Sequence, residues 1–105
     1  MSKVKVMMID IESNTRFWRE VEGRAVSFAE FREYSFILHR SPNNTGLWRI
    51  SDAITGMYFI EEPTPNKALK SAKEKLIVKG KEKLNEAIEK AHELLKNTPL
   101  LDGGE

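Results

Sequence analysis

The stretch LWRISDAITGMYFI, residues 47–60, decides the fold that the sequence predicts. Two short apolar runs flank a polar centre that ends in Thr55-Gly56. Such a centre between apolar segments is typical of a β-hairpin, and glycine tolerates the backbone angles that its loop requires. We therefore predict two paired strands, at residues 47–51 and 57–61.

Side chains alternate between the two faces of a strand. Trp48 and Ile50 are therefore expected on one face of the hairpin, as part of the core. Arg49 is expected on the opposite face. Whether Arg49, Asp52 and Tyr58 form a surface that a partner reads stays open from the sequence alone.

Working outward, YSFILHR at residues 34–40 predicts a third strand of the same meander. The residues between it and the hairpin are rich in proline, asparagine and glycine, which is turn chemistry. Near the N-terminus, KVKVMMIDI at residues 3–11 alternates lysine with valine and then becomes apolar. This pattern predicts a further, half-buried strand.

Residues 16–34 leave two interpretations open. In one, Glu22-Gly23 forms a tight turn and a single helical turn follows over residues 28–33. Ser27 and Glu30 have the spacing of a capping box, which favours that helical turn. In the other interpretation, the segment is extended.

The C-terminal third predicts helix. Thr64 can cap its start, and Pro65 is tolerated at the first helical position. Gly80 falls in the one long gap of the apolar stripe and favours a break or a kink. Thr98-Pro99 ends the helix. Leucine, isoleucine and alanine recur at spacings of three and four at positions 68, 69, 72, 76, 84, 87, 88, 91 and 95.

The predicted fold is therefore α+β: an antiparallel sheet of about four strands, packed by one kinked or two C-terminal helices. With 105 residues in all, we expect residues 1–98 to form a single domain and residues 99–105 a flexible tail. The chain has no cysteine, which excludes disulfides and thiolate metal sites. Its longest apolar run covers residues 6–9, so we expect a cytoplasmic protein without a membrane partner.

Catalytic parts are scarce in the sequence. Asp10 and Glu12 resemble the paired carboxylates of a two-metal nuclease, but that chemistry needs further carboxylates and a longer fold. His39 and His92 are the only histidines and lack the spacing of metal ligands. We expect a protein that is not an enzyme and that holds no metal or cofactor.

Charge is the clearest functional signal. The net charge is only +1, yet residues 66–83 hold seven lysines and two glutamates. Point charges of this kind bind phosphate groups without exact geometry, although a solvated helix face is the commoner explanation. The arginines of the meander could add stacking on single-stranded bases. The candidate partner- or nucleic-acid-binding residues are Arg40, Arg49, Lys67, Lys70, Lys73 and Lys79.

Four quoted segments together carry a resemblance: YSFILHRSP, LWRISDAITGMYFI, TPNKALKSAKEKL and GKEKLNEAIEKA. They resemble short accessory domains of phages and other mobile elements, which combine a W-x-[VI]-[ST]-x-x-x-T-G hairpin with a T-x-x-x-A helix. The resemblance covers about residues 34–91 and carries no catalytic residues. It implies a phage-encoded inhibitor or modulator of host machinery, such as a defence system, that binds a host or phage protein. The alternatives are a nucleic-acid-binding accessory protein that uses the basic segment, and a structural homodimer.

Overall fold

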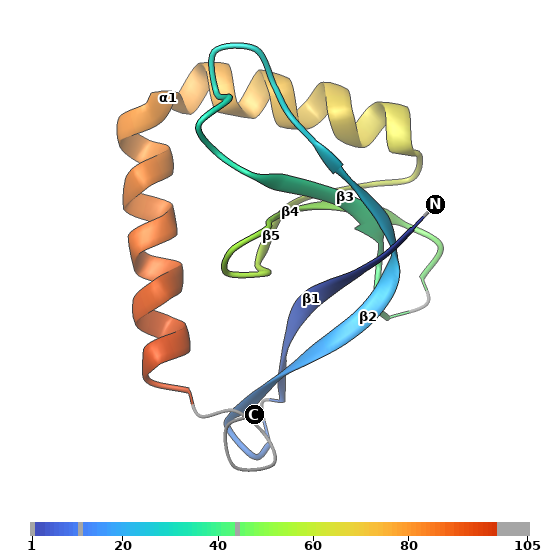
Figure 1. The fold of residues 1–105 in the computed structure, drawn as a ribbon, viewed down its shortest axis with the longest axis vertical. Coiled ribbons are helices and arrows are strands. Elements are labelled where there is room, and N and C mark those ends of the chain that lie inside the picture. The colour runs from blue at the N-terminus through green and yellow to red at the C-terminus, as the bar shows by residue number, and fades with distance from the viewer. Residues whose placement is uncertain (1, 11, 44, 99–105) are drawn as a thin grey trace.

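The computed structural model describes residues 2–10, 12–43 and 45–98. All five strands belong to one antiparallel sheet, in which each strand pairs with the next along the chain. The predicted α+β class is confirmed, with five strands where about four were expected. The predicted tail, residues 99–105, lies outside the described residues. In chain order (Figure 1) the elements are β1 (Ser2–Asp10), β2 (Thr15–Val26), β3 (Phe36–Arg40), β4 (Trp48–Asp52), β5 (Tyr58–Glu62) and α1 (Pro65–Lys96).

The predicted meander is present as β3, β4 and β5. Ile50 of β4 lies opposite Leu38 of β3 and Ile60 of β5, so these three side chains share the face toward the helix. The β4–β5 loop is closed from within. One carboxylate oxygen of Asp52 accepts hydrogen bonds from the backbone nitrogen and the hydroxyl of Thr55, at 2.9 and 2.8 Å.

The path of β2 settles the first half of the region that the sequence left open. β2 runs through 12 residues without a break, pairing first with β1 and then with β3. The extended interpretation holds here: Glu22-Gly23 does not form a tight turn, because Gly23 lies inside the strand, between Ser2 and His39. A Cβ at Gly23 would lie 2.7 Å from the carbonyl oxygen of Leu38. Glycine is present here because the strands cross closely.

The helical turn over residues 28–33, which belonged to one of the two open interpretations, does not form either. Phe31 donates to the carbonyl of Phe28 and Tyr34 to that of Phe31, which makes two successive turns. Glu30 between them has φ of 72°, outside the helical region. Phe28 and Phe31 are both buried. Burial of two aromatic side chains outweighs the capping signal in the local sequence.

The sheet curls until β1 reaches the β4–β5 connection. The backbone nitrogen of Met7 donates to the carbonyl oxygen of Gly56 at 3.0 Å. This curvature creates a second, smaller buried region, which includes Val6, Ile37 and His39. Their side chains lie apart from the main hydrophobic cluster, which packs between the sheet and the helix.

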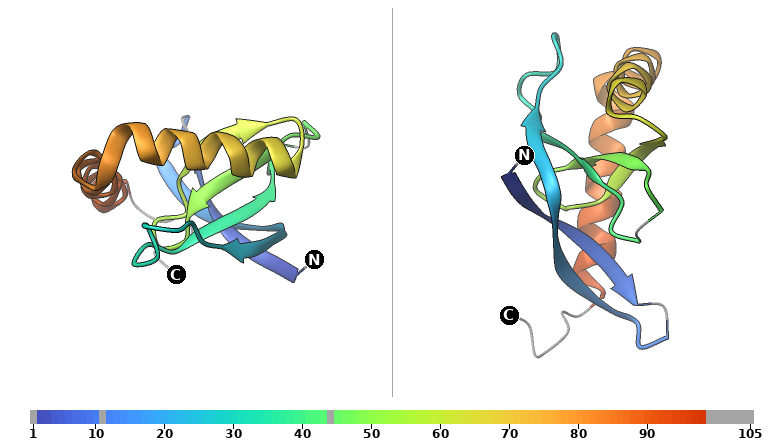
Figure 2. Two further views of the ribbon diagram at one scale, coloured as in Figure 1. Left: turned by 90° about the horizontal axis from the view of Figure 1, so that it is seen from above. Right: turned by 90° about the vertical axis from the view of Figure 1, so that its right-hand side faces the viewer.

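The first half of α1, residues 65–79, covers the meander (Figure 2). Thr64 caps its start as predicted, accepting a hydrogen bond from the backbone nitrogen of Lys67 at 3.2 Å. The apolar residues that recur every four positions lie on the side of α1 that packs against the sheet. The main cluster contains Phe28, Phe31, Phe36, Leu38, Ile50, Ile60, Ala68, Ala72, Leu76 and Leu84.

At Gly80 the helix turns sharply, and its second half, residues 81–96, runs down one side of the molecule (Figure 1). The predicted kink is confirmed: Gly80 has φ of 77° and ψ of 170°, a conformation essentially restricted to glycine. The far end of the helix is attached to the β1–β2 hairpin. The Arg16 guanidinium donates to the carbonyl oxygens of Leu95 and Thr98, at 3.0 and 2.7 Å. The Leu95 carbonyl also accepts from the backbone nitrogen of Thr98 at 3.3 Å, so Arg16 adds to the bonds at this helix end.

Candidate interaction surfaces

Three of the predicted lysines form one ridge, which we call the lysine ridge: Lys67, Lys70 and Lys73. All three are exposed on the first half of α1. A spacing of three residues places successive side chains about 60° apart around a helix, so Lys67 and Lys73 lie about 60° to either side of Lys70 and the three spread over one outward face. Lys79 is different, because nine residues after Lys70 the helix has turned by about 180°.

The two predicted arginines do not join this ridge or each other. In the pairing of β3 with β4, Arg40 lies opposite Trp48 and Arg49 lies opposite His39. Neighbouring pairs point to opposite faces of a sheet, so Arg40 and Arg49 face apart. They cannot act together on one flat ligand.

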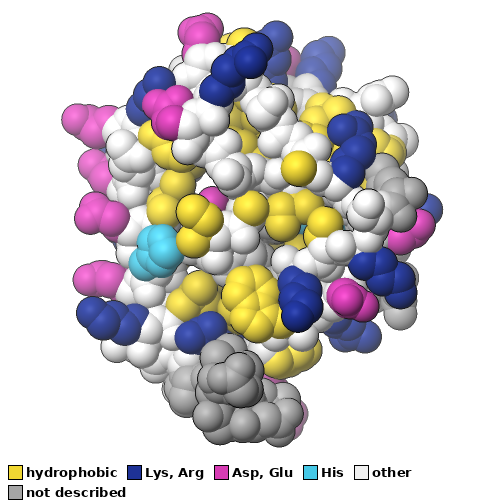
Figure 3. All heavy atoms as spheres, in the orientation of Figure 1, with side chains coloured by type: hydrophobic (Ala, Val, Ile, Leu, Met, Phe, Trp, Pro, Cys, Tyr) yellow, Lys and Arg dark blue, Asp and Glu magenta, His cyan; other side chains and the backbone are white. Residues whose placement is uncertain are grey.

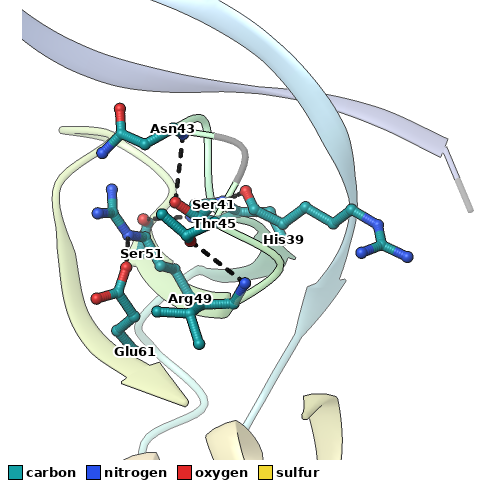
Figure 4. Close-up of polar contacts among 9 residues, drawn as sticks. His39, Ser41, Asn43, Thr45, Arg49, Ser51 and Glu61 are labelled. Carbon is teal, nitrogen blue, oxygen red and sulfur yellow. Dashed lines mark hydrogen bonds and ion pairs between the residues drawn. The ribbon is translucent and has the colours of Figure 1, made fainter. Parts of the chain in front are cut away.

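Both arginines already have partners inside the protein. The side chain of Arg49 is only 11% exposed and bonds to Glu61 at 2.7 Å (Figure 4). It also lies 3.8 Å above the ring of Tyr58. Arg40 pairs with Glu22 at 3.1 Å and stacks on Trp48 at 4.6 Å. The sequence left open whether Arg49 belongs to a surface that a partner contacts. In the structure Arg49 instead links β4 to β5. Arg40 keeps about half of its side chain exposed.

Two other lysines of the basic segment bond to other parts of the fold. Lys75 donates to the carbonyl oxygen of Phe59 at 3.1 Å, which covers part of the edge of β5. Lys81 lies 2.6 Å from Glu33. Their hydrogen bond raises the pKa of Lys81 and lowers the pKa of Glu33. The seven lysines of residues 66–83 therefore form two groups: those that bond within the fold, such as Lys75 and Lys81, and those that extend into solvent.

His39 and Ser51 form a buried pair in the small core (Figure 4). The Nδ1 of His39 lies 2.8 Å from the carbonyl oxygen of Arg40, which can only accept, so Nδ1 carries the proton. Nε2 then accepts from the hydroxyl of Ser51 at 2.7 Å. This is the arrangement of a base and a nucleophile, but the residues are 1% and 0% exposed. We assign the pair a structural role, because neither side chain is accessible to a substrate.

Because His39 is buried, stability should depend on pH. Burial lowers the pKa of His39 from its usual 6.5, and the charge of Arg49 lowers it further, against the opposing hydrogen bond to Arg40. The unfolded chain therefore takes up the proton first as the pH falls. We expect the free energy of unfolding to decrease below about pH 6.5, by up to about 1.4 kcal/mol per pH unit for this one group.

The measurement is urea unfolding at pH values from neutral to mildly acidic. His39→Gln, which keeps a donor and an acceptor but does not titrate, should remove most of the decrease. His92→Gln is the matched control, because His92 is exposed on α1. An unchanged decrease in His39→Gln would contradict the assignment.

A hydrophobic groove separates the second half of α1 from the β4–β5 connection. Its volume is about 220 Å³. Figure 3 shows hydrophobic side chains gathered on this face, beside the helix. The sheet side contributes Phe36, Met57 and Tyr58, among others, and the helix contributes Leu84, Ala87 and Ala91. The sequence contained the signal, since two alanines on the inner stripe leave space that a larger residue would fill.

Polar contacts on either side of the groove fix its walls. Tyr34 donates to the side-chain oxygen of Asn85 at 2.6 Å, near the start of the second half of α1. Arg16 fixes the other end of that half through its bonds to Leu95 and Thr98. The helix is therefore held beside the sheet at both ends while small side chains lie between. A groove that is open before a partner arrives costs little reorganisation on binding.

The nuclease-like motif does not assemble. Asp10 ends β1, and its carboxylate accepts a hydrogen bond from the backbone nitrogen of Glu12 at 3.0 Å. Both side chains are exposed, and Glu12 lies in the turn rather than on the strand. Among the described residues, no three histidine, aspartate or glutamate side chains are grouped to hold a metal ion. In the same part of the chain, no helix is long and apolar enough to cross a membrane.

Comparison with known proteins gives no family. No protein family, curated protein or solved structure matches the chain significantly. The resemblance to phage accessory domains therefore stays a prediction, and the function has to be argued from the surfaces described above.

Proposed function

We propose that this protein is a non-enzymatic binding module that acts in the cytoplasm by protein–protein contact. The observation that carries the proposal is the hydrophobic groove beside the second half of α1. Its walls are fixed by Tyr34, Asn85 and Arg16, so it does not close on itself. Hydrophobic pockets with fixed walls are the common form of binding sites.

The kind of partner follows from the sequence. The resemblance of residues 34–91 to phage accessory domains favours a phage-encoded inhibitor or modulator of host machinery, such as a defence system. A small protein of this class acts by occupying a surface of its target. A groove that accepts a hydrophobic side chain of the target contributes affinity and fixes the position of the target on the protein.

Filling the groove tests the proposal. Ala91→Leu places a larger side chain in the groove, and Ala29→Leu makes the same change at an exposed loop position. Tagged wild-type protein and Ala29→Leu are expected to recover the same specific partner from a bacterial lysate. Ala91→Leu should lose most of it while unfolding at the same or a higher temperature. Equal recovery by all three proteins, or no specific partner for any, would refute the proposal.

The lysine ridge supports a second candidate function, nucleic-acid binding. Lys67, Lys70 and Lys73 have no acidic partner within 4 Å among the described residues, and they share one exposed face of the helix. Three phosphate contacts would give an affinity that falls roughly as the third power of salt concentration. The DNA measurement described in the next subsection separates this candidate from the alternatives.

A further inference from the structure

Two aliphatic side chains project from the bend of α1. Ile77 is 59% exposed and Val78 is 85% exposed, the highest value among the large exposed hydrophobic residues of the described chain. Isolated exposed hydrophobic residues are ordinary, but here two adjacent ones stand at a corner of the molecule. We call them the elbow pair.

The elbow pair continues the lysine ridge. Ile77 follows Lys70 by seven residues and Lys73 by four, so it lies on the same stripe of the helix. Val78 is the next residue, about 100° further around the helix and four residues after Glu74, the one acidic residue of this face. The result is a single outward surface that has cations along its length and aliphatic groups at its end.

The surrounding structure holds the pair outward. Ala72 and Leu76 are buried against the sheet, which fixes the rotation of the last turns before the bend. Gly80 then redirects the chain, and Lys81 is held by Glu33 at 2.6 Å. Turning Ile77 and Val78 inward would expose Leu76, so the protein cannot cover the pair by a small rotation.

Three kinds of partner can be compared on this chemistry. A nucleic acid would use the lysines, but the phosphate backbone has no use for two aliphatic groups. An uncharged hydrophobic protein pocket would use the elbow pair, but not the three lysines. An anionic lipid surface takes both, because aliphatic groups enter the boundary of the acyl region while lysines remain among the negative headgroups.

From this match we infer that the first half of α1 is a peripheral contact for anionic phospholipid surfaces. The lysine ridge supplies attraction to the headgroups, and the elbow pair supplies insertion. The contact lies on the surface and does not span the bilayer. It departs from the absence of a membrane partner that the sequence predicted, and it is independent of the groove.

Vesicle cosedimentation tests the insertion. Wild-type protein is expected to bind phosphatidylcholine vesicles that contain phosphatidylglycerol and to leave pure phosphatidylcholine vesicles unbound. Ile77→Ser combined with Val78→Ser should weaken that binding at least about tenfold. Ile54→Ser is the matched control, because Ile54 is 69% exposed in the β4–β5 connection, away from this surface. Equal binding by the double variant and the control would overturn the inference.

The charge is tested on the same vesicles. Lys70→Gln and Lys73→Gln should each weaken binding about fivefold, since a lysine near an anionic surface contributes about one such factor. Fluorescence anisotropy with duplex DNA is run in parallel. If the protein binds DNA tightly and loses vesicle binding only through the lysine variants, the ridge is a polyanion site and the inference is wrong. Thermal unfolding should be unchanged in every variant, because all these side chains are exposed.

Discussion

Phe36→Ala is expected to lower the free energy of unfolding by about 3–5 kcal/mol, the range measured for buried aromatic truncations. Phe36 is 1% exposed, at the start of β3. Its ring lies 5.6 Å from the ring of Phe28, 6.3 Å from that of Tyr34 and 5.5 Å from that of Phe59. Removing it leaves a cavity where the meander, the loop before it and the helix meet.

Urea unfolding of wild type and variant measures this change. Phe17→Ala is the control. Phe17 lies in β2, is less buried than Phe36 and does not belong to the main cluster. Its loss is expected to be clearly smaller. A loss below about 1 kcal/mol for Phe36→Ala would mean that the aromatic cluster is not the centre of the core.

Gly56→Ala is expected to lower the free energy of unfolding by about 3 kcal/mol, from backbone strain and crowding together. Gly56 has φ of 76°, where a side chain is strained. Its Cβ would also lie 2.7 Å from the backbone nitrogen of Met7 and 2.8 Å from the ring of Trp18. The change therefore pushes β1 away from the β4–β5 connection.

The chain offers a close control in Gly46→Ala. Gly46 has φ of 81° but nothing within 4 Å of its added Cβ, so only the backbone term, about 1 kcal/mol, should be lost. The difference between the two losses in free energy of unfolding measures how much the contact between β1 and the β4–β5 connection stabilises the protein. Hydrogen exchange of the Met7 amide should accelerate in Gly56→Ala alone. Equal losses in both variants would show that β1 does not depend on this contact.

Local patterns predicted the elements whose stability is decided locally. The apolar runs and turn residues of residues 34–61 predicted the meander, because a hairpin turn depends on the few residues within it. Thr64-Pro65 predicted the start of α1, because capping involves only neighbouring backbone groups. The kink at Gly80 followed from the low helix propensity of glycine. Of the four predicted lysines, three share a face of the helix, and Lys79 does not because of its spacing.

Long-range contacts decided the rest. The path of β2 depends on Gly23 fitting between two other strands, and its neighbours in sequence suggest a turn instead. The placement of Arg49 depends on Glu61 and Tyr58 of the next strand, which turn a candidate ligand residue into a brace.

By itself the sequence determined the class of fold, the meander, the helix with its bend and the stripe of lysines, because each is encoded within a few neighbouring residues. Only the tertiary structure decided that the sheet curls onto Gly56, that His39 and Ser51 are sealed inside, and that a groove stays open. It also placed Ile77 and Val78 at an exposed corner. These features depend on how segments far apart in the sequence pack against one another, and a pattern of neighbouring residues does not encode that packing.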